Sequence, residues 1–161
     1  MELKFKNGKF RIMQIADVQD TQRTSDATVR FIREALKKAQ PDLVVFTGDQ
    51  VKGYGFNLMG GDNKKKVTEC INKLLTPLDE TGIPFTFVFG NHDDQAFSIS
   101  KKEQSEIYGS HENCVAYNAD DEIKLQHQSI LIPKNEYRAR CSRSKRCFDN
   151  AFALESTIGT R

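Results

Sequence analysis

The chain has 161 residues, of which 38% are hydrophobic and 29% charged, so its size fits one globular domain and excludes two well-packed ones. Its apolar runs fall short of the roughly 20 residues that a membrane span needs, and its first residues lack the apolar core of a secretory signal; we therefore expect no membrane segment, a cytoplasmic location and reduced cysteines. The net charge of +2 is unevenly divided, because residues 1–123 carry 16 Lys and Arg against 19 Asp and Glu, whereas residues 124–161 carry 8 against 3.

Strand and helix patterns alternate along the first half of the chain. Short runs rich in β-branched and aromatic residues predict strands, and stretches with apolar side chains every three or four positions predict amphipathic helices. On these patterns we expect strands at 10–16, 42–47 and 84–89, with helices at 25–39 and 64–80 between them. The order βαβαβ predicts an α/β fold in which a parallel sheet is flanked by helices.

Two shorter elements are expected after the third strand. Ser100 and Glu103 have the spacing of a capping box, which predicts a short helix ending near Gly109. Residues 114–117 have the composition of one more strand.

The segment 53–62 contains four glycines. Two interpretations are open: a flexible surface loop, or a mobile flap over a site at the strand ends. It is not a phosphate-binding Walker A loop, because no Gly-Lys-Ser/Thr follows it.

Polar residues follow each of the three predicted strands directly. Residues 17–20 (Asp-Val-Gln-Asp) come after the first strand, 48–49 (Gly-Asp) after the second, and 90–94 (Gly-Asn-His-Asp-Asp) after the third. Because the carboxyl ends of parallel strands lie along one edge of the sheet, we expect these side chains to converge there. Carboxylates crowded at one edge repel each other unless a cation compensates them, so the pattern predicts a metal site.

The donor types indicate the metal and the reaction. A mixture of Asp, Asn and His suits Mn, Fe, Mg or Zn better than it suits a thiolate zinc site. Two metal ions that share a carboxylate can activate a water molecule and hold a phosphoryl oxygen, which makes hydrolysis of a phosphate ester the natural reaction.

The three motifs resemble those of the calcineurin-like metallophosphoesterase superfamily, which are Asp-x-His, Gly-Asp and Gly-Asn-His-Asp/Glu. The resemblance covers about residues 8–123 and implies the first half of an α/β/β/α sandwich, two divalent metal ions and a phosphate-ester substrate. Residues 124–161 lie outside it.

The resemblance also implies a role for each motif residue. Asp17 would hold the first metal ion and Asn91 the second, with Asp49 bridging the two. His92 would act on the leaving group as a general acid or orienting donor, and Asp93 would steer its imidazole.

The chain departs from the family pattern at Gln19, where the commoner pattern has a histidine ligand. Two interpretations are open: Gln19 is a variant ligand through its amide oxygen, or it hydrogen-bonds a bound water. An amide oxygen is a harder donor than imidazole, so as a ligand it would favour Mn, Fe or Mg over Zn.

A larger departure is the lack of the Gly-His and Gly-His-x-His motifs that complete the family's site. The remaining histidines, His111 and His127, do not follow a glycine, and we interpret both as ordinary polar residues. The donor set is therefore incomplete, and a second function stays open beside the phosphoesterase: a non-catalytic metal- or phosphate-binding module, or an inactive remnant.

The basic tail at 124–161 has three possible origins. It is a disordered tail of a truncated or frame-shifted product, a genuine alternative ending that packs on the sheet, or a nucleic-acid patch; the last is disfavoured because no aromatic residues interleave with its charges. Since the second sheet of the sandwich is missing, we expect an exposed apolar sheet face that favours association and lowers stability.

Overall fold

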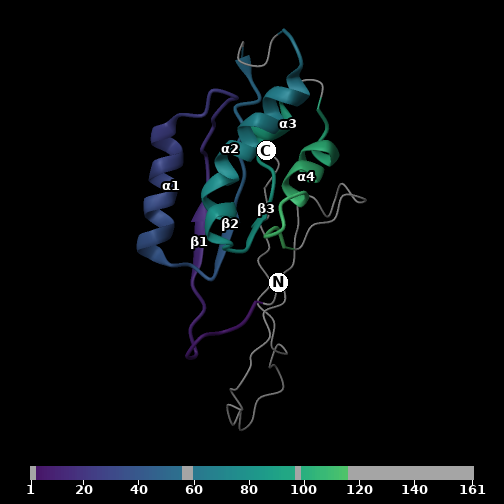
Figure 1. Ribbon diagram of the computed structural model, residues 1–161. Coiled ribbons are helices and arrows are strands. Elements are labelled where there is room, and N and C mark those ends of the chain that lie inside the picture. Colours follow the sequence, from purple (N-terminus) through teal and green to yellow (C-terminus); the bar gives the residue numbers. More distant parts are fainter. Residues whose placement is uncertain (1–2, 56–59, 97–98, 116–161) are drawn as a thin grey trace, which may run out of the picture.

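Residues 3–55, 60–96 and 99–115 are described by the computed structural model, and they form a three-stranded parallel sheet with helices packed on it (Figure 1). The elements follow the order β1 (Ile12–Ile15), α1 (Asp26–Ala39), β2 (Leu43–Phe46), α2 (Asn63–Thr81), β3 (Phe85–Phe87), α3 (Asn91–Asp94) and α4 (Lys101–Gly109). The predicted βαβαβ arrangement and the α/β fold class are confirmed. Helix α3, a single turn, was not expected.

The sheet has the strand order β1-β2-β3. Strand β1 pairs with β2 in the register Ile12↔Leu43, and β2 pairs with β3 in the register Val44↔Phe85, both parallel. All three strands therefore end at one edge, where the polar motifs follow. Beside β3, Cys114 forms a parallel bridge with Phe85, which agrees with the start of the expected strand at 114–117; residues 116 and 117 lie outside the described part.

Local capping fixes the ends of the long helices. Ser25 accepts a hydrogen bond from the first turn of α1, and Asp62 does the same for α2. Gly82 caps the C-terminal end of α2 with φ of 65°, a conformation that glycine adopts without steric cost. Among the described residues, no helix has both the length and the hydrophobicity needed to cross a membrane.

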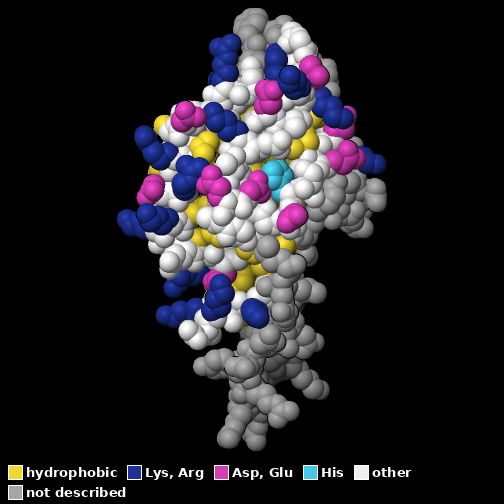
Figure 2. Space-filling view, viewed as in Figure 1, with side chains coloured by type: hydrophobic (Ala, Val, Ile, Leu, Met, Phe, Trp, Pro, Cys, Tyr) yellow, Lys and Arg dark blue, Asp and Glu magenta, His cyan; other side chains and the backbone are white. Residues whose placement is uncertain are grey.

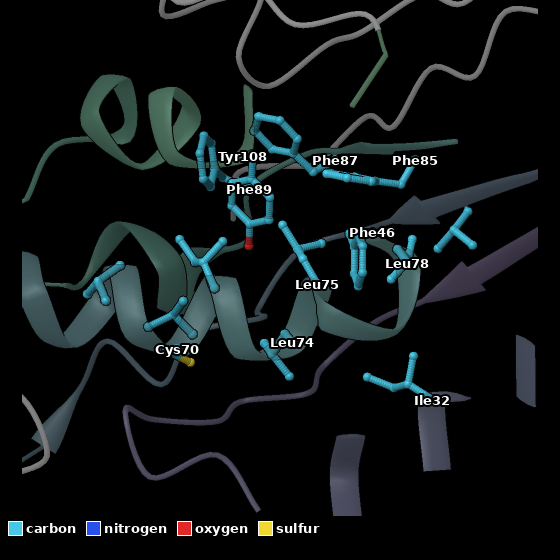
Figure 3. Close-up of a cluster of buried hydrophobic side chains, with 14 of the residues drawn as sticks. Ile32, Phe46, Cys70, Leu74, Leu75, Leu78, Phe85, Phe87, Phe89 and Tyr108 are labelled. Atoms are coloured by element: carbon cyan, nitrogen blue, oxygen red, sulfur yellow. The ribbon is translucent and has the colours of Figure 1, made fainter. Parts of the chain in front are cut away.

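The main core lies between the sheet and the helices. Helix α2 lies between α1 and α4 and contacts both (Figure 1). Its apolar side chains belong to the same buried cluster as those of β2 and β3. Figure 3 shows aromatic side chains from β3 and α4 gathered over α2. Phe87 stacks on Tyr108 with ring centroids 4.2 Å apart, and Phe89 meets Phe87 edge to face at 5.4 Å. This cluster fixes the chain just before the third motif.

On the other face of the sheet β2 is covered, which corrects the expectation that this strand has an open apolar side. Leu43 and Val45 are 0% and 5% exposed, and they pack with Leu3 and with Phe5 and Phe10 of the segment before β1. The exposed apolar surface lies instead beside β1, where Phe31 on α1 is 73% exposed. A hollow of about 640 Å³ separates β1 from α1 at this place.

Candidate functional site

The three motifs form three loops that lie in contact at the carboxyl edge of the sheet: the first loop (17–20), the second loop (48–51) and the third loop (90–94). The first and second loops run side by side. Asp17 N donates to the carbonyl oxygen of Gly48 at 3.1 Å, and Gln19 N donates to that of Asp49 at 2.9 Å. These bonds continue the parallel pairing of β1 and β2 beyond the strands and place Asp17, Gln19 and Asp49 together.

The third loop is joined to the second through the Asp49 carboxylate. The backbone N–H of His92 donates to Asp49 Oδ1 at 2.8 Å. Gly90 lies against the same carboxylate, and a Cβ atom there would overlap Asp49 Oδ1. Glycine is therefore required at this position by the close approach of the two loops. Asp49 thus contacts the first loop through its carbonyl oxygen and the third loop through its carboxylate.

Three of the candidate ligands have a strained backbone. Asp17, Gln19 and Asp49 have φ values of 54°, 46° and 57°, in the left-handed region that residues with a Cβ atom rarely adopt. Such strain costs about 1–3 kcal/mol per residue and persists where the surrounding structure enforces it, most often at functional sites. The strain therefore marks this edge of the sheet independently of the sequence motifs.

Asp93 is 1% exposed, and its carboxylate organises the backbone of two loops. Oδ2 accepts from Asp49 N at 2.7 Å and from Gly90 N at 2.9 Å, and Oδ1 accepts from Val51 N at 2.8 Å. Burial raises the pKa of Asp93 to about 6. The three N–H donors lower this pKa and the charge of Asp49 raises it, each by less than burial does. Its role is to hold the second and third loops together.

This arrangement corrects the expectation that Asp93 steers the imidazole of His92. The imidazole is oriented by Gln95, whose Oε1 lies 2.9 Å from His92 Nδ1, with Asn91 Nδ2 at 3.2 Å. The ring of Tyr54 packs against it with centroids 4.4 Å apart. The half-buried imidazole is thus held by three side chains. Asp93 acts only indirectly, by holding the backbone of the loop that carries His92.

The donors that could hold a metal ion are two carboxylates and two amides, from Asp17, Asp49, Gln19 and Asn91. Asp17 and Asn91 are exposed, and Gln19 and Asp49 are half-buried, so a hydrated ion can reach them. These oxygen donors fit a hard divalent ion such as Mn²⁺ or Mg²⁺. In the described residues no three His, Cys, Asp or Glu side chains gather as a metal-binding group, so the fit depends on the amides.

The other histidines do not complete this set. His111 Nδ1 lies 2.9 Å from Asp79 Oδ2, and its Nε2 lies 3.1 Å from Asn72 Oδ1. Both ring nitrogens are thus occupied by side chains of α2, which agrees with the interpretation of His111 as an ordinary polar residue. His127, like the whole basic tail at 124–161, lies outside the described residues.

A profile of the calcineurin-like phosphoesterases matches residues 10–152, a span that includes all three loops. The chain belongs to this family. The match extends past residue 123, where the resemblance inferred from the three motifs ended. Metallophosphoesterases generally use divalent metal ions, and the family takes its name from the phosphate esters on which its enzymes act.

Curated relatives in this family include phosphatases. "Phosphatase DCR2" of Saccharomyces cerevisiae is 30% identical over 115 residues, which cover 62% of this chain and 18% of that protein. "Probable inactive purple acid phosphatase 28" of Arabidopsis thaliana is 29% identical over 60% of this chain and 26% of that protein. "Probable inactive purple acid phosphatase 29" of the same organism is 32% identical over 59% of this chain and 27% of that protein. The chain spans about a quarter of these relatives or less.

In this member of the family, Gln95 and Tyr54 are site residues that the sequence did not predict. Gln95 lies three residues after His92, a spacing that brings side chains together on a helical turn, but the turn α3 was not expected. Tyr54 lies in the glycine-rich segment, whose composition gives no periodic signal. Its contact with Gln19 depends on the pairing of the first two loops.

Proposed function

We propose that this chain is the N-terminal part of a metal-dependent phosphoesterase, which hydrolyses a phosphate ester with an activated water molecule. The observation that supports this most directly is that Asp49 contacts both other loops, while Asp17, Gln19 and Asp49 all have a strained backbone. A cytoplasmic location remains a prediction from the sequence.

In this proposal two divalent ions, with Mn or Fe favoured, are held by the candidate donors. Asp17 and Gln19 would hold one ion and Asn91 the other, with Asp49 between them. Bound ions of this kind lower the pKa of a water molecule and neutralise charge on the phosphoryl group. The described residues would supply part of each coordination shell.

His92 would handle the proton of the leaving group. Gln95 Oε1, 2.9 Å from His92 Nδ1, accepts from Nδ1 when that nitrogen carries a hydrogen, whereas Asn91 Nδ2 at 3.2 Å donates to Nδ1 when it carries none. In the imidazolium form both ring nitrogens carry a hydrogen, so Nδ1–H would donate to Gln95 and Nε2–H would be the proton given to the leaving oxygen. Asp93 would hold the loops that carry His92 and Asp49 in register, and it would not itself exchange protons with the substrate.

The second candidate function is a metal- or phosphate-binding module without turnover. The names of relatives favour it: two of those given above carry the words "probable inactive". This candidate predicts metal binding at the same carboxylates.

The two functions are separated by assaying hydrolysis of an aryl phosphate monoester and diester with added Mn²⁺, Fe²⁺, Mg²⁺ or Zn²⁺. We expect turnover that Asp49→Asn reduces to the blank. Asp94→Asn serves as the matched control, because Asp94 is exposed on the same edge and pairs with Lys101 at 3.3 Å. Thermal stabilisation by Mn²⁺ that Asp49→Asn abolishes, without turnover, would favour the binding module. Turnover that survives Asp49→Asn would contradict the proposed site.

A further inference from the structure

The backbone that follows the second loop is fixed against the other two loops. Lys52 N donates to the carbonyl oxygen of Asp20 at 2.8 Å, in the first loop. Gly53 is buried against the third loop, where a Cβ atom would overlap the carbonyl oxygen of His92. This packing sets the position of Tyr54, the next residue. At residues 53 and 54, the glycine-rich segment is therefore part of the site.

Tyr54 contacts a site residue from each neighbouring loop. Its hydroxyl donates to Gln19 Oε1 at 3.0 Å, and its ring lies 4.4 Å from the imidazole of His92, tilted by 42°. The ammonium of Lys52 lies over the same ring, 5.1 Å from its centroid. The half-buried tyrosine thus links Gln19 to His92, two residues that are 73 positions apart in the sequence.

We propose that Tyr54 is a positioning residue of this site: its hydroxyl orients the Gln19 amide and its ring orients the His92 imidazole. The inference rests on the proposed function. A glutamine amide has an oxygen that accepts and a nitrogen that only donates, and the two ends exchange by rotation of the terminal bond. A phenol that donates to Oε1 fixes the oxygen end and leaves that oxygen a second lone pair for a cation. Tyr54 thereby fixes the direction in which the Gln19 amide oxygen points, and with it the position at which that oxygen can bind a cation.

The contacts themselves are tested by NMR in the absence of metal. The Tyr54 ring current shifts the ring protons of His92, so Tyr54→Leu is expected to move these resonances and Tyr54→Phe to leave them nearly in place. Tyr54→Phe is instead expected to move the side-chain amide resonances of Gln19, because it removes only the hydroxyl. Unchanged His92 resonances in Tyr54→Leu, with the fold retained by circular dichroism, would overturn the proposal.

The effect on the cation site is tested by Mn²⁺ titration, followed by electron paramagnetic resonance of the free ion. Loss of a residue that orients a ligand typically weakens metal affinity by 10–100-fold, so we expect about a tenfold loss in Tyr54→Phe. In a Gln19→Ala background the same substitution is expected to cause no further loss, because Tyr54 acts through Gln19. Tyr108→Phe, which removes a hydroxyl in the core, is the control and should bind Mn²⁺ as the unmodified chain does.

Each outcome has one meaning. Unchanged affinity in Tyr54→Phe, or an equal loss in both backgrounds, would overturn the positioning role. A chain that binds no Mn²⁺ would instead contradict the proposed function, and the orientation of Gln19 and His92 by Tyr54 would then be judged by the NMR shifts alone.

Discussion

The Asp93 carboxylate accounts for much of the order of the site although it is hidden from solvent. Its two oxygens accept three backbone N–H groups, from Asp49, Val51 and Gly90. Val51 is buried and Asp49 and Gly90 are half-buried, and a buried N–H group left without a partner costs about 1–3 kcal/mol. A single side chain therefore joins the loop after β2 to the loop after β3.

Asp93→Asn tests this role. The amide keeps the shape of the side chain, but its NH₂ group cannot accept, so at least one of the three N–H donors loses its partner. We expect the free energy of unfolding, measured by urea denaturation, to fall by about 2–3 kcal/mol. Asp94→Asn, an exposed neighbour that pairs with Lys101, is the control, and its loss should stay below about 1 kcal/mol. Equal effects of the two substitutions would contradict the role given to Asp93.

At the residue scale, the sequence predicted which positions lie at the site better than it predicted their contacts. The placement of the three motifs behind parallel strands follows from topology, and the structure brings their backbones together. Which side chain touches the imidazole depends on local geometry. On a helical turn, adjacent residues such as His92 and Asp93 point in different directions, whereas His92 and Gln95 lie on one face.

At the scale of elements, α4 is held by a capping box. Ser100 Oγ accepts from Glu103 N at 3.2 Å, and Glu103 Oε2 accepts from Ser100 N at 2.9 Å. Lys64 of α2 pairs with the same glutamate at 3.0 Å. The Ser100 N–H and the Lys64 ammonium lower the pKa of Glu103 to about 2. The box thus both begins α4 and joins it to α2.

The lowered pKa predicts a pH dependence of stability. The folded chain holds Glu103 ionised more strongly than the unfolded chain, whose glutamate has a pKa near its ordinary value of 4.5. The stabilisation is therefore present in full above about pH 4.5 and is lost as the pH falls toward 2. We expect the stability difference between the unmodified chain and Glu103→Gln, measured by urea denaturation, to shrink over that interval. Glu106→Gln removes a charge outside the box and is the control; a difference independent of pH would contradict the prediction.

Helices were predicted more accurately than short or non-local features. The signals at Ser25, Gly82 and Ser100 lie within a few residues of the helix ends that they fix, so the bounds of α1, α2 and α4 agree with the sequence to within one residue. The four-residue α3 is too short for a periodic signal. The cover over Leu43 and Val45 comes from a segment more than 30 residues earlier, which no local pattern encodes.

At the scale of the whole molecule, the surface combines mixed charge with an apolar stretch beside β1. In Figure 2, acidic and basic side chains are interspersed over the face shown, with hydrophobic side chains visible between them. The described sheet ends at β1, and Phe31 on the adjacent α1 is 73% exposed. Met13 and Ile15 line the hollow between them. Apolar surface of this kind favours association.

Phe31→Ser tests whether this surface accounts for the expected association. Because the ring is mostly exposed, its loss should change the free energy of unfolding by no more than about 0.5 kcal/mol. It should nevertheless lower the fluorescence of a dye that binds apolar surface and reduce any self-association seen by sedimentation. Lys37→Ser, at an exposed position in the last turn of the same helix, is the control. If the unmodified chain bound no dye and unfolded cooperatively as a monomer, the hollow beside β1 would not be an association surface, and the exposed ring would be a local feature of α1.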